Sequence, residues 1–226
     1  MKNLKVLLGA LSMLTLGAAN ASTLVLDSFN YNPALELTVN SGFGNGTAID
    51  TVQSVESFAR AQYELNYTNT ESGSATTTAN KAFVSDGILS YGENPNGNGT
   101  LNIKWDYVNG ALLDFTGYSD FYFDVTYIDG SGGFDATLTL EDADGTLISA
   151  TYNISSVGVF LAGFSSMMAG ADFDFTQVRS ATAFISSDGA GDDFALDSVG
   201  LVPAPASIAL LGLGLLGLGL RSRKSI

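Results

Sequence analysis

The sequence predicts an all-β protein whose central domain is an antiparallel β-sandwich. Two observations carry this prediction. Apolar side chains alternate with polar ones at a period of two residues in several segments, whereas a helix needs apolar residues three and four apart. Clusters of glycine, asparagine and aspartate, which favour tight turns, separate these segments. Many short strands at regular spacing are typical of a sandwich.

The predicted strands differ in how clearly they alternate. In the first, Leu24 and Leu26 are expected on one face and Val25 and Asp27 on the other. Residues 142–145 have the composition of a hairpin turn. The predicted strands, in chain order, are residues 23–29, 60–68, 101–107, 121–127, 138–141, 147–152, 181–186 and 194–199.

The N-terminus predicts a secretory signal peptide over residues 1–21. Two lysines precede an apolar stretch at residues 6–16, and Ala19 and Ala21 form a small-residue cleavage site before Ser22. Signal peptidase is the expected processing partner, and the domain would then span residues 22–201. The alternative is an uncleaved N-terminal anchor.

The C-terminal segment, residues 202–226, has three parts in a fixed order. A proline pair at 202–205 precedes an uncharged apolar block at 206–220, and a basic end follows at 221–224. As a helix the block would rise about 22 Å against a hydrocarbon core of about 30 Å, so it is a short transmembrane candidate. Basic residues lie at the outer end of each hydrophobic segment. Both chain termini are therefore expected on the cytoplasmic side, with the domain outside. A simple membrane anchor and a buried core helix are the alternatives.

This tail resembles the PEP-CTERM sorting tail of bacterial surface proteins. The matching residues are Val202, Pro203, Pro205, Arg221, Arg223 and Lys224. Ala204 stands where that motif usually has glutamate. The resemblance implies processing by an exosortase. It also implies an exported protein that is held transiently in the inner membrane and then reaches the cell surface or the extracellular space.

The predicted domain is strongly acidic. Residues 22–201 contain 23 carboxylates and four basic residues, a formal net charge of −19. Such a domain repels nucleic acid, so no nucleic-acid partner is expected. The chain also lacks histidine and cysteine, which excludes Ser-His-Asp and Cys-His catalysis. A carboxylate pair is the remaining catalytic option, but no short motif selects one.

An acidic loop near the end of the domain is a candidate calcium site. Asp188, Asp192 and Asp193 could supply oxygen ligands, and Asp27 and Asp197 are expected to join them if the first and last strands pair. The stretch 192–199 resembles the closing strand of jelly-roll carbohydrate-binding modules, in which the first and last strands are often neighbours. The alternative is a solvated acidic loop without an ion.

An outward aromatic side chain is the candidate sugar contact. Phe121, Phe123, Val125 and Tyr127 are expected on the core face of one strand, which leaves Tyr122 pointing outward. Trp105, in register with apolar neighbours, is instead expected in the core.

These observations predict a non-enzymatic surface or extracellular-matrix protein. Its expected role is structural or adhesive, associated with exopolysaccharide or biofilm. The alternative is a lectin-like carbohydrate-binding module assisted by Ca²⁺, and a third, less favoured reading is a carbohydrate-active enzyme.

Overall fold

The computed structural model describes residues 22–31, 35–39, 46–53, 60–69, 80–93, 97–106, 110–130, 132–167, 172–187, 189 and 191–205. The predicted signal peptide and the predicted transmembrane block and basic end lie outside these residues. Within the described part of the chain, no helix is long and apolar enough to cross a membrane.

The described chain is almost entirely β-structure, as the alternation predicts. It forms thirteen strands and one short 3-10 helix: β1 (Leu24–Asp27), β2 (Leu35–Val39), β3 (Gly46–Gln53), β4 (Arg60–Asn69), β5 (Asn80–Ser85), β6 (Ile88–Gly92), β7 (Gly97–Asp106), β8 (Tyr118–Ile128), β9 (Phe134–Asp142), β10 (Leu147–Ile154), β11 (Gly158–Gly163), η1 (Phe164–Ser166), β12 (Val178–Ser187) and β13 (Asp193–Pro203).

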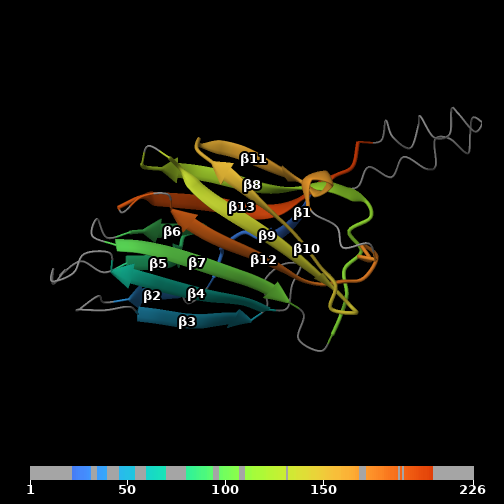
Figure 1. Ribbon diagram of the computed structural model, residues 1–226, viewed down its shortest axis with the longest axis horizontal. Coiled ribbons are helices and arrows are strands. Elements are labelled where there is room, and N and C mark those ends of the chain that lie inside the picture. The colour runs from blue at the N-terminus through green and yellow to red at the C-terminus, as the bar shows by residue number, and fades with distance from the viewer. Residues whose placement is uncertain are drawn as a thin grey trace, which may run out of the picture.

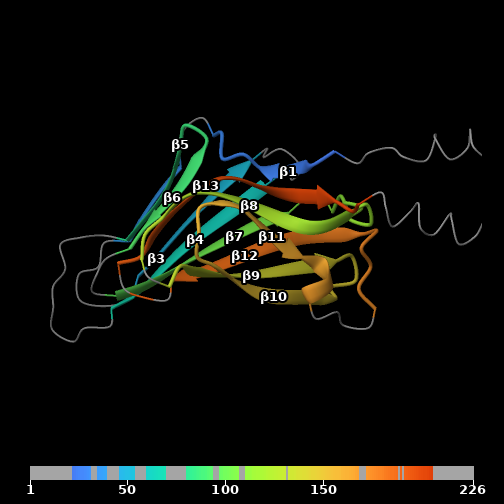
Figure 2. The ribbon, with the colours of Figure 1, turned by 90° about the horizontal axis from the view of Figure 1, so that it is seen from above.

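The strands form two antiparallel sheets packed face to face. One has seven strands in the order β11-β8-β13-β6-β5-β2, with β1 beside the end of β13. The other has six strands in the order β10-β9-β12-β7-β4-β3 (Figure 1). Figure 2 shows them as two layers. The predicted β-sandwich is therefore confirmed.

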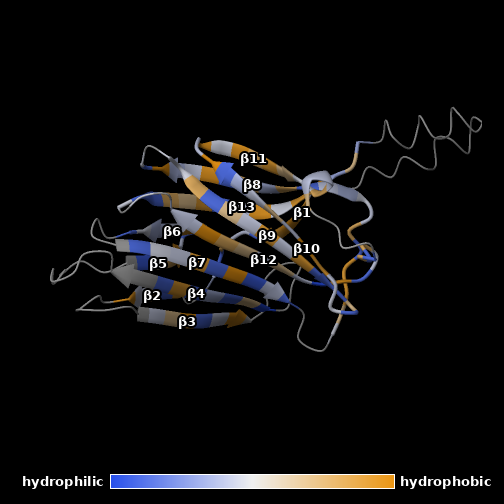
Figure 3. Cartoon of the chain, in the orientation of Figure 1, coloured by the Kyte–Doolittle hydropathy of each residue, from blue (hydrophilic) through white to orange (hydrophobic). Residues whose placement is uncertain are grey.

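The core lies between the two sheets because one face of each strand is apolar. In β9 buried and half-buried residues alternate along the whole strand, and Figure 3 shows the same alternation of hydrophobic and hydrophilic residues on its neighbours. Trp105 and Tyr63 from the six-stranded sheet are fully buried, as are Phe121 and Phe123 from the seven-stranded sheet. The prediction that Trp105 fills the core is confirmed.

The hairpin predicted around residues 142–145 is also confirmed. β9 and β10 pair from Glu141 with Leu147 onward. The Asp142 carboxylate holds the turn by accepting the backbone N–H groups of Asp144 at 3.0 Å and Thr146 at 2.8 Å. A third N–H, from Asp174, reaches its other oxygen at 3.0 Å. These bonds to backbone N–H groups, that of Asp174 first, lower the pKa of Asp142.

The first and last strands are neighbours, as expected. β1 pairs antiparallel with the second half of β13, with Leu24 opposite Leu201. Because the pairing is antiparallel, the start of β1 and the end of β13 lie at the same end of the sandwich (Figure 2). Both hydrophobic ends of the sequence therefore connect to one end of the domain.

Candidate functional site

A row of outward side chains crosses four strands of the seven-stranded sheet. Phe83 of β5 pairs with Ser90 of β6, and Ser90 pairs with Ala195 of β13. Ala195 pairs in turn with Tyr127 of β8. Residues that far apart in sequence thus form one line on the outer face of the sheet.

The two ends of this row are aromatic and its middle is small. Phe83 is 42% exposed and Tyr127 is 50% exposed, whereas Ser90 and Ala195 between them are short. The row spans three inter-strand spacings, or about 14 Å. Together with Gly92 it encloses an open groove of about 410 Å³, hereafter the sheet groove. Two aromatic walls and a small-residue floor give a shape that accepts a flat ring.

Polar groups line the same groove. The Tyr127 hydroxyl donates to Asp129 Oδ2 at 3.3 Å, and the charge of Asp129 raises the pKa of Tyr127. Asp193 also lines the groove, and its Oδ1 accepts the backbone N–H of Glu93 at 2.9 Å. With Ser90, these groups provide hydroxyl donors and carboxylate acceptors beside the aromatic rings.

A β-bulge in β8 creates the Tyr127 wall. Leu196 pairs with Val125 and Ala195 with Tyr127, so Thr126 is an extra residue in the ladder. Its hydroxyl donates to the Ala195 carbonyl at 3.3 Å. The extra residue reverses the alternation, and Tyr127 faces outward. The prediction that Tyr127 shares the core face of Phe121 was therefore wrong.

Tyr122, the predicted sugar contact, is not an open surface ring. It lies on the outer face, as predicted, but it is only 8% exposed. Its ring covers Gly200 of the neighbouring strand, where an added Cβ would lie 2.5 Å from Tyr122 Cε1. The prediction was therefore wrong about the exposure of this residue. No local sequence signal shows that Tyr122 is covered, because the cover comes from packing of its ring over Gly200 of the neighbouring strand.

Asp27 belongs to the core and not to a surface ion site. A register shift between Val25 and Asp27 turns this carboxylate inward, where it is fully buried. Its Oδ2 accepts Tyr31 at 2.5 Å, Tyr63 at 2.8 Å and the Trp105 indole N–H at 2.8 Å. Burial raises the pKa of Asp27, against the lowering effect of these bonds.

The predicted convergence of Asp27 with Asp197 is wrong, although their strands do pair. Asp197 is exposed and lines a shallow outer depression of about 340 Å³ with Asp86 and Ser198. Asp27 faces the opposite side, inside the sandwich, because the bulge in β1 reverses its direction.

Asp192 and the nearby Glu93 accept hydrogen bonds from the protein's own donors. Asp192 Oδ2 accepts the backbone N–H of Gly189 at 3.0 Å. Glu93 is mostly buried and accepts the Ser187 hydroxyl at 2.7 Å, and burial raises the pKa of Glu93. Among the described residues, no three acidic side chains converge as metal ligands. Asp188 lies outside these residues, so calcium binding at this loop stays a prediction.

The first residues of the predicted sorting motif are part of the sandwich. β13 continues through Pro203, beyond the domain boundary predicted at residue 201. Val202 pairs with Asp120 and Pro203 with Tyr118 at the start of β8. The basic residues Arg221, Arg223 and Lys224 lie outside the described part of the chain.

Comparison with known protein families identifies this end of the chain. Residues 201–224 match the model of the PEP-CTERM protein-sorting motif. The tail is a PEP-CTERM sorting motif. The resemblance predicted from the proline pair and the basic end is thereby confirmed. The PEP-CTERM motif implies processing by an exosortase and an exported, surface-directed protein.

Several solved structures are similar to the sandwich, at low sequence identity. The family 11 carbohydrate-binding module of the cellulosomal cellulase Lic26A-Cel5E of Clostridium thermocellum is 12% identical, with a TM-score of 0.42 over 82% of this chain and 97% of the module. A family 11 carbohydrate-binding module from Clostridium thermocellum in complex with a β-1,3-1,4-mixed-linked tetrasaccharide is 14% identical, with a TM-score of 0.41 over 82% of this chain and 98% of the module. TmCBM61, in complex with β-1,4-galactotriose, is 9% identical, with a TM-score of 0.31 over 77% and 90%. No curated protein sequence matches the chain.

Proposed function

We propose that the sandwich is a non-enzymatic polysaccharide-binding module, presented outside the cell by its PEP-CTERM tail, and that the sheet groove holds the glycan. The observation that carries this proposal is the row in which Phe83 and Tyr127 stand at either end of Ser90 and Ala195. An adhesive role in an extracellular matrix follows from binding of this kind.

The chemistry of the sheet groove suits a sugar chain. A sugar ring has an apolar C–H face that packs on an aromatic side chain, and hydroxyls that need donors and acceptors at its edge. Phe83 and Tyr127 supply the aromatic surfaces, and Ser90, Asp193 and the Tyr127 hydroxyl supply the polar edge. Ligand sites in proteins commonly combine apolar walls with a few placed polar groups.

The charges around the groove favour an uncharged glycan. Asp193 and Asp129 lie at one end. At the other end Glu36 pairs with Phe83 in the ladder, and its carboxylate lies 3.8 Å from Lys81. The domain also has a formal net charge of −19. A polyanion would be repelled both locally and by this overall field.

Binding measurements on matched variants test the proposal. Wild-type protein and the variants Phe83→Ala and Tyr127→Ala are titrated with neutral and anionic polysaccharides. Loss of one aromatic wall is expected to weaken binding of a neutral glycan by about tenfold, a typical effect for a central aromatic contact. Phe184→Ala is the control, because Phe184 is 40% exposed on β12 of the other sheet.

Three results would count against the proposal. Unchanged affinity in both groove variants would remove the sheet groove as the site. An equal loss in Phe184→Ala would indicate general surface adhesion. Release of reducing sugar from the bound polysaccharide by the wild type would make the protein an enzyme.

A further inference from the structure

The sorting motif is held against the folded domain by its backbone. Beyond the last strand pair, the N–H of Ala204 donates to the carbonyl of Gly117 at 2.9 Å. Pro203 has no N–H, so it leaves a gap in the ladder, and this bond continues the contact past it. Pro203 and Ala204 are half-buried, and exposure begins at Pro205.

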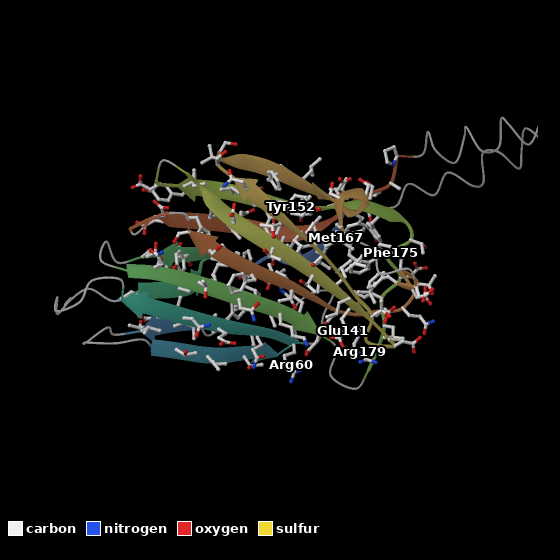
Figure 4. All side chains as sticks on the ribbon, viewed as in Figure 1. Arg60, Glu141, Tyr152, Met167, Phe175 and Arg179 are labelled. Atoms are coloured by element: carbon white, nitrogen blue, oxygen red, sulfur yellow. The ribbon has the colours of Figure 1, made fainter. Side chains whose placement is uncertain are left out.

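The partner of the motif is anchored to the core of the domain through Phe115. Residues 117–120, hereafter the docking segment, begin two residues after Phe115, which is fully buried. Phe115 donates its N–H to the Phe175 carbonyl at 2.8 Å and accepts the N–H of Tyr118 at 3.0 Å. Its ring stacks on Phe164 with centroids 6.2 Å apart. In Figure 4, Phe175 lies at the end of the sandwich where β13 ends.

We propose that the docking segment is an intramolecular binding site for the sorting motif that shields it from the processing enzyme. An enzyme that reads or cuts a peptide needs its substrate backbone extended in its own site, and backbone groups paired to β8 are not available for that. Tail processing therefore proceeds from the minor state in which residues 202–204 have separated from the docking segment. The lifetime of the membrane-anchored form depends on this local opening. The covalent chemistry that follows belongs to the processing enzyme.

A displaced motif tests the proposal without changing the motif itself. Inserting Gly-Ser-Gly-Ser between Leu201 and Val202 places the inserted residues opposite the docking segment and moves the motif beyond it. The control carries the same insertion between Pro205 and Ala206. It lengthens the connection to the apolar segment equally but leaves the motif docked. Both full-length proteins are expressed with an exosortase, and tail loss is followed over time by intact mass.

The first insertion is expected to accelerate tail loss by about fivefold, the change in open fraction that corresponds to one backbone hydrogen bond. The control should be processed at the wild-type rate. Equal rates in all three proteins would overturn the proposal, because docking would then have no effect. Slower processing of the displaced motif would also overturn it and would mean that the enzyme reads the docked strand.

Hydrogen exchange of the Ala204 amide in the full-length protein provides a second measurement. It should exchange slowly in the wild type and in the control, and at the rate of an unstructured peptide in the first insertion variant. Fast exchange in the wild type would overturn the proposal.

Phe115→Leu leaves the tail sequence and length unchanged. By loosening the docking segment, it should raise both the exchange rate and the processing rate, and unchanged rates in a folded variant would count against docking.

Discussion

The buried carboxylate of Asp27 connects the two sheets of this sandwich. Asp27 comes from β1, whereas Tyr63 and Trp105, which donate to it, come from the opposite sheet. Its other oxygen accepts the N–H of Phe29 at 2.9 Å. A buried carboxylate is tolerated only when its acceptor capacity is used, and here four donors use it. Asp27 therefore contributes to specifying how the first strand is placed on the core.

The raised pKa of Asp27 predicts a pH dependence of stability. Since burial raises the pKa of this carboxyl in the folded state, its stabilising contribution is complete below the ordinary aspartate pKa and is lost as pH rises through the folded-state value. Asp27→Asn cannot titrate. We expect the melting temperature of the wild type, relative to Asp27→Asn, to fall as pH is raised from about 3.9 toward neutrality.

Thermal melts of both proteins across this pH range measure the difference in melting temperature. Asp197→Asn, at an exposed site, is the control. A difference that stays constant with pH would show that Asp27 titrates normally in the folded protein. Glu93, whose pKa burial also raises, remains in both proteins and cancels in the comparison.

At the scale of the element, β13 organises the molecule. It pairs with β8 along one edge and with β6 and then β1 along the other. This requires close approach at Gly200, where an added Cβ would contact the Leu24 carbonyl and lie 2.5 Å from Tyr122 Cε1. A side chain at this position cannot fit without displacing β1 or the tyrosine ring.

Gly200→Ala is therefore expected to destabilise the domain by about 1–3 kcal/mol, the usual cost of overpacking. Chemical denaturation followed by tryptophan fluorescence measures the change, because Trp105 lies in the core. Gly117→Ala is the matched control, since nothing lies within 4 Å of its added Cβ. Equal stabilities of the two variants would mean that β1 moves aside without cost.

The elements were predictable from the sequence wherever alternation is regular. In residues 101–105 and 121–125 the apolar side chains face the core as their period of two predicts, because each sheet buries one of its two faces. The predictions fail at bulges. One extra residue reverses the direction of Tyr127, and another register shift turns Asp27 into the core. Alternation cannot reveal an extra residue, because a bulge is defined only by the partner strand.

The candidate site was hidden for the same reason. Phe83, Ser90, Tyr127 and Ala195 form a row only through the pairing of four strands that are distant in sequence. Alternation alone correctly places Tyr122 on the outer face. It does not show that the ring is buried, because that burial comes from packing over Gly200 of the neighbouring strand. The sorting tail, in contrast, is a contiguous motif, and contiguous signals can be read from the sequence alone.

At the scale of the whole molecule, the sheet groove and the sorting motif lie toward opposite ends of one strand. The groove contains Ala195 near the start of β13, and the sorting motif begins at its end. From Ala195 to Pro203 the strand extends about 25 Å. The apolar block at 206–220 follows directly, so no long linker separates the domain from the predicted membrane segment. A rigid strand would thus hold the groove away from the bilayer before the tail is removed.

This geometry predicts different accessibility at the two ends of the anchored protein. The chain has no cysteine, so a single introduced thiol reports one position. Ser90→Cys places it in the groove, and Thr116→Cys places it beside Gly117, which binds the motif. A water-soluble maleimide should label Ser90→Cys equally fast in full-length protein in nanodiscs and in the released domain. Labelling of Thr116→Cys should slow in nanodiscs, because the bilayer then lies next to that end. Slower labelling of Ser90→Cys in nanodiscs would mean that the groove faces the membrane, and the anchored form could not then bind a glycan.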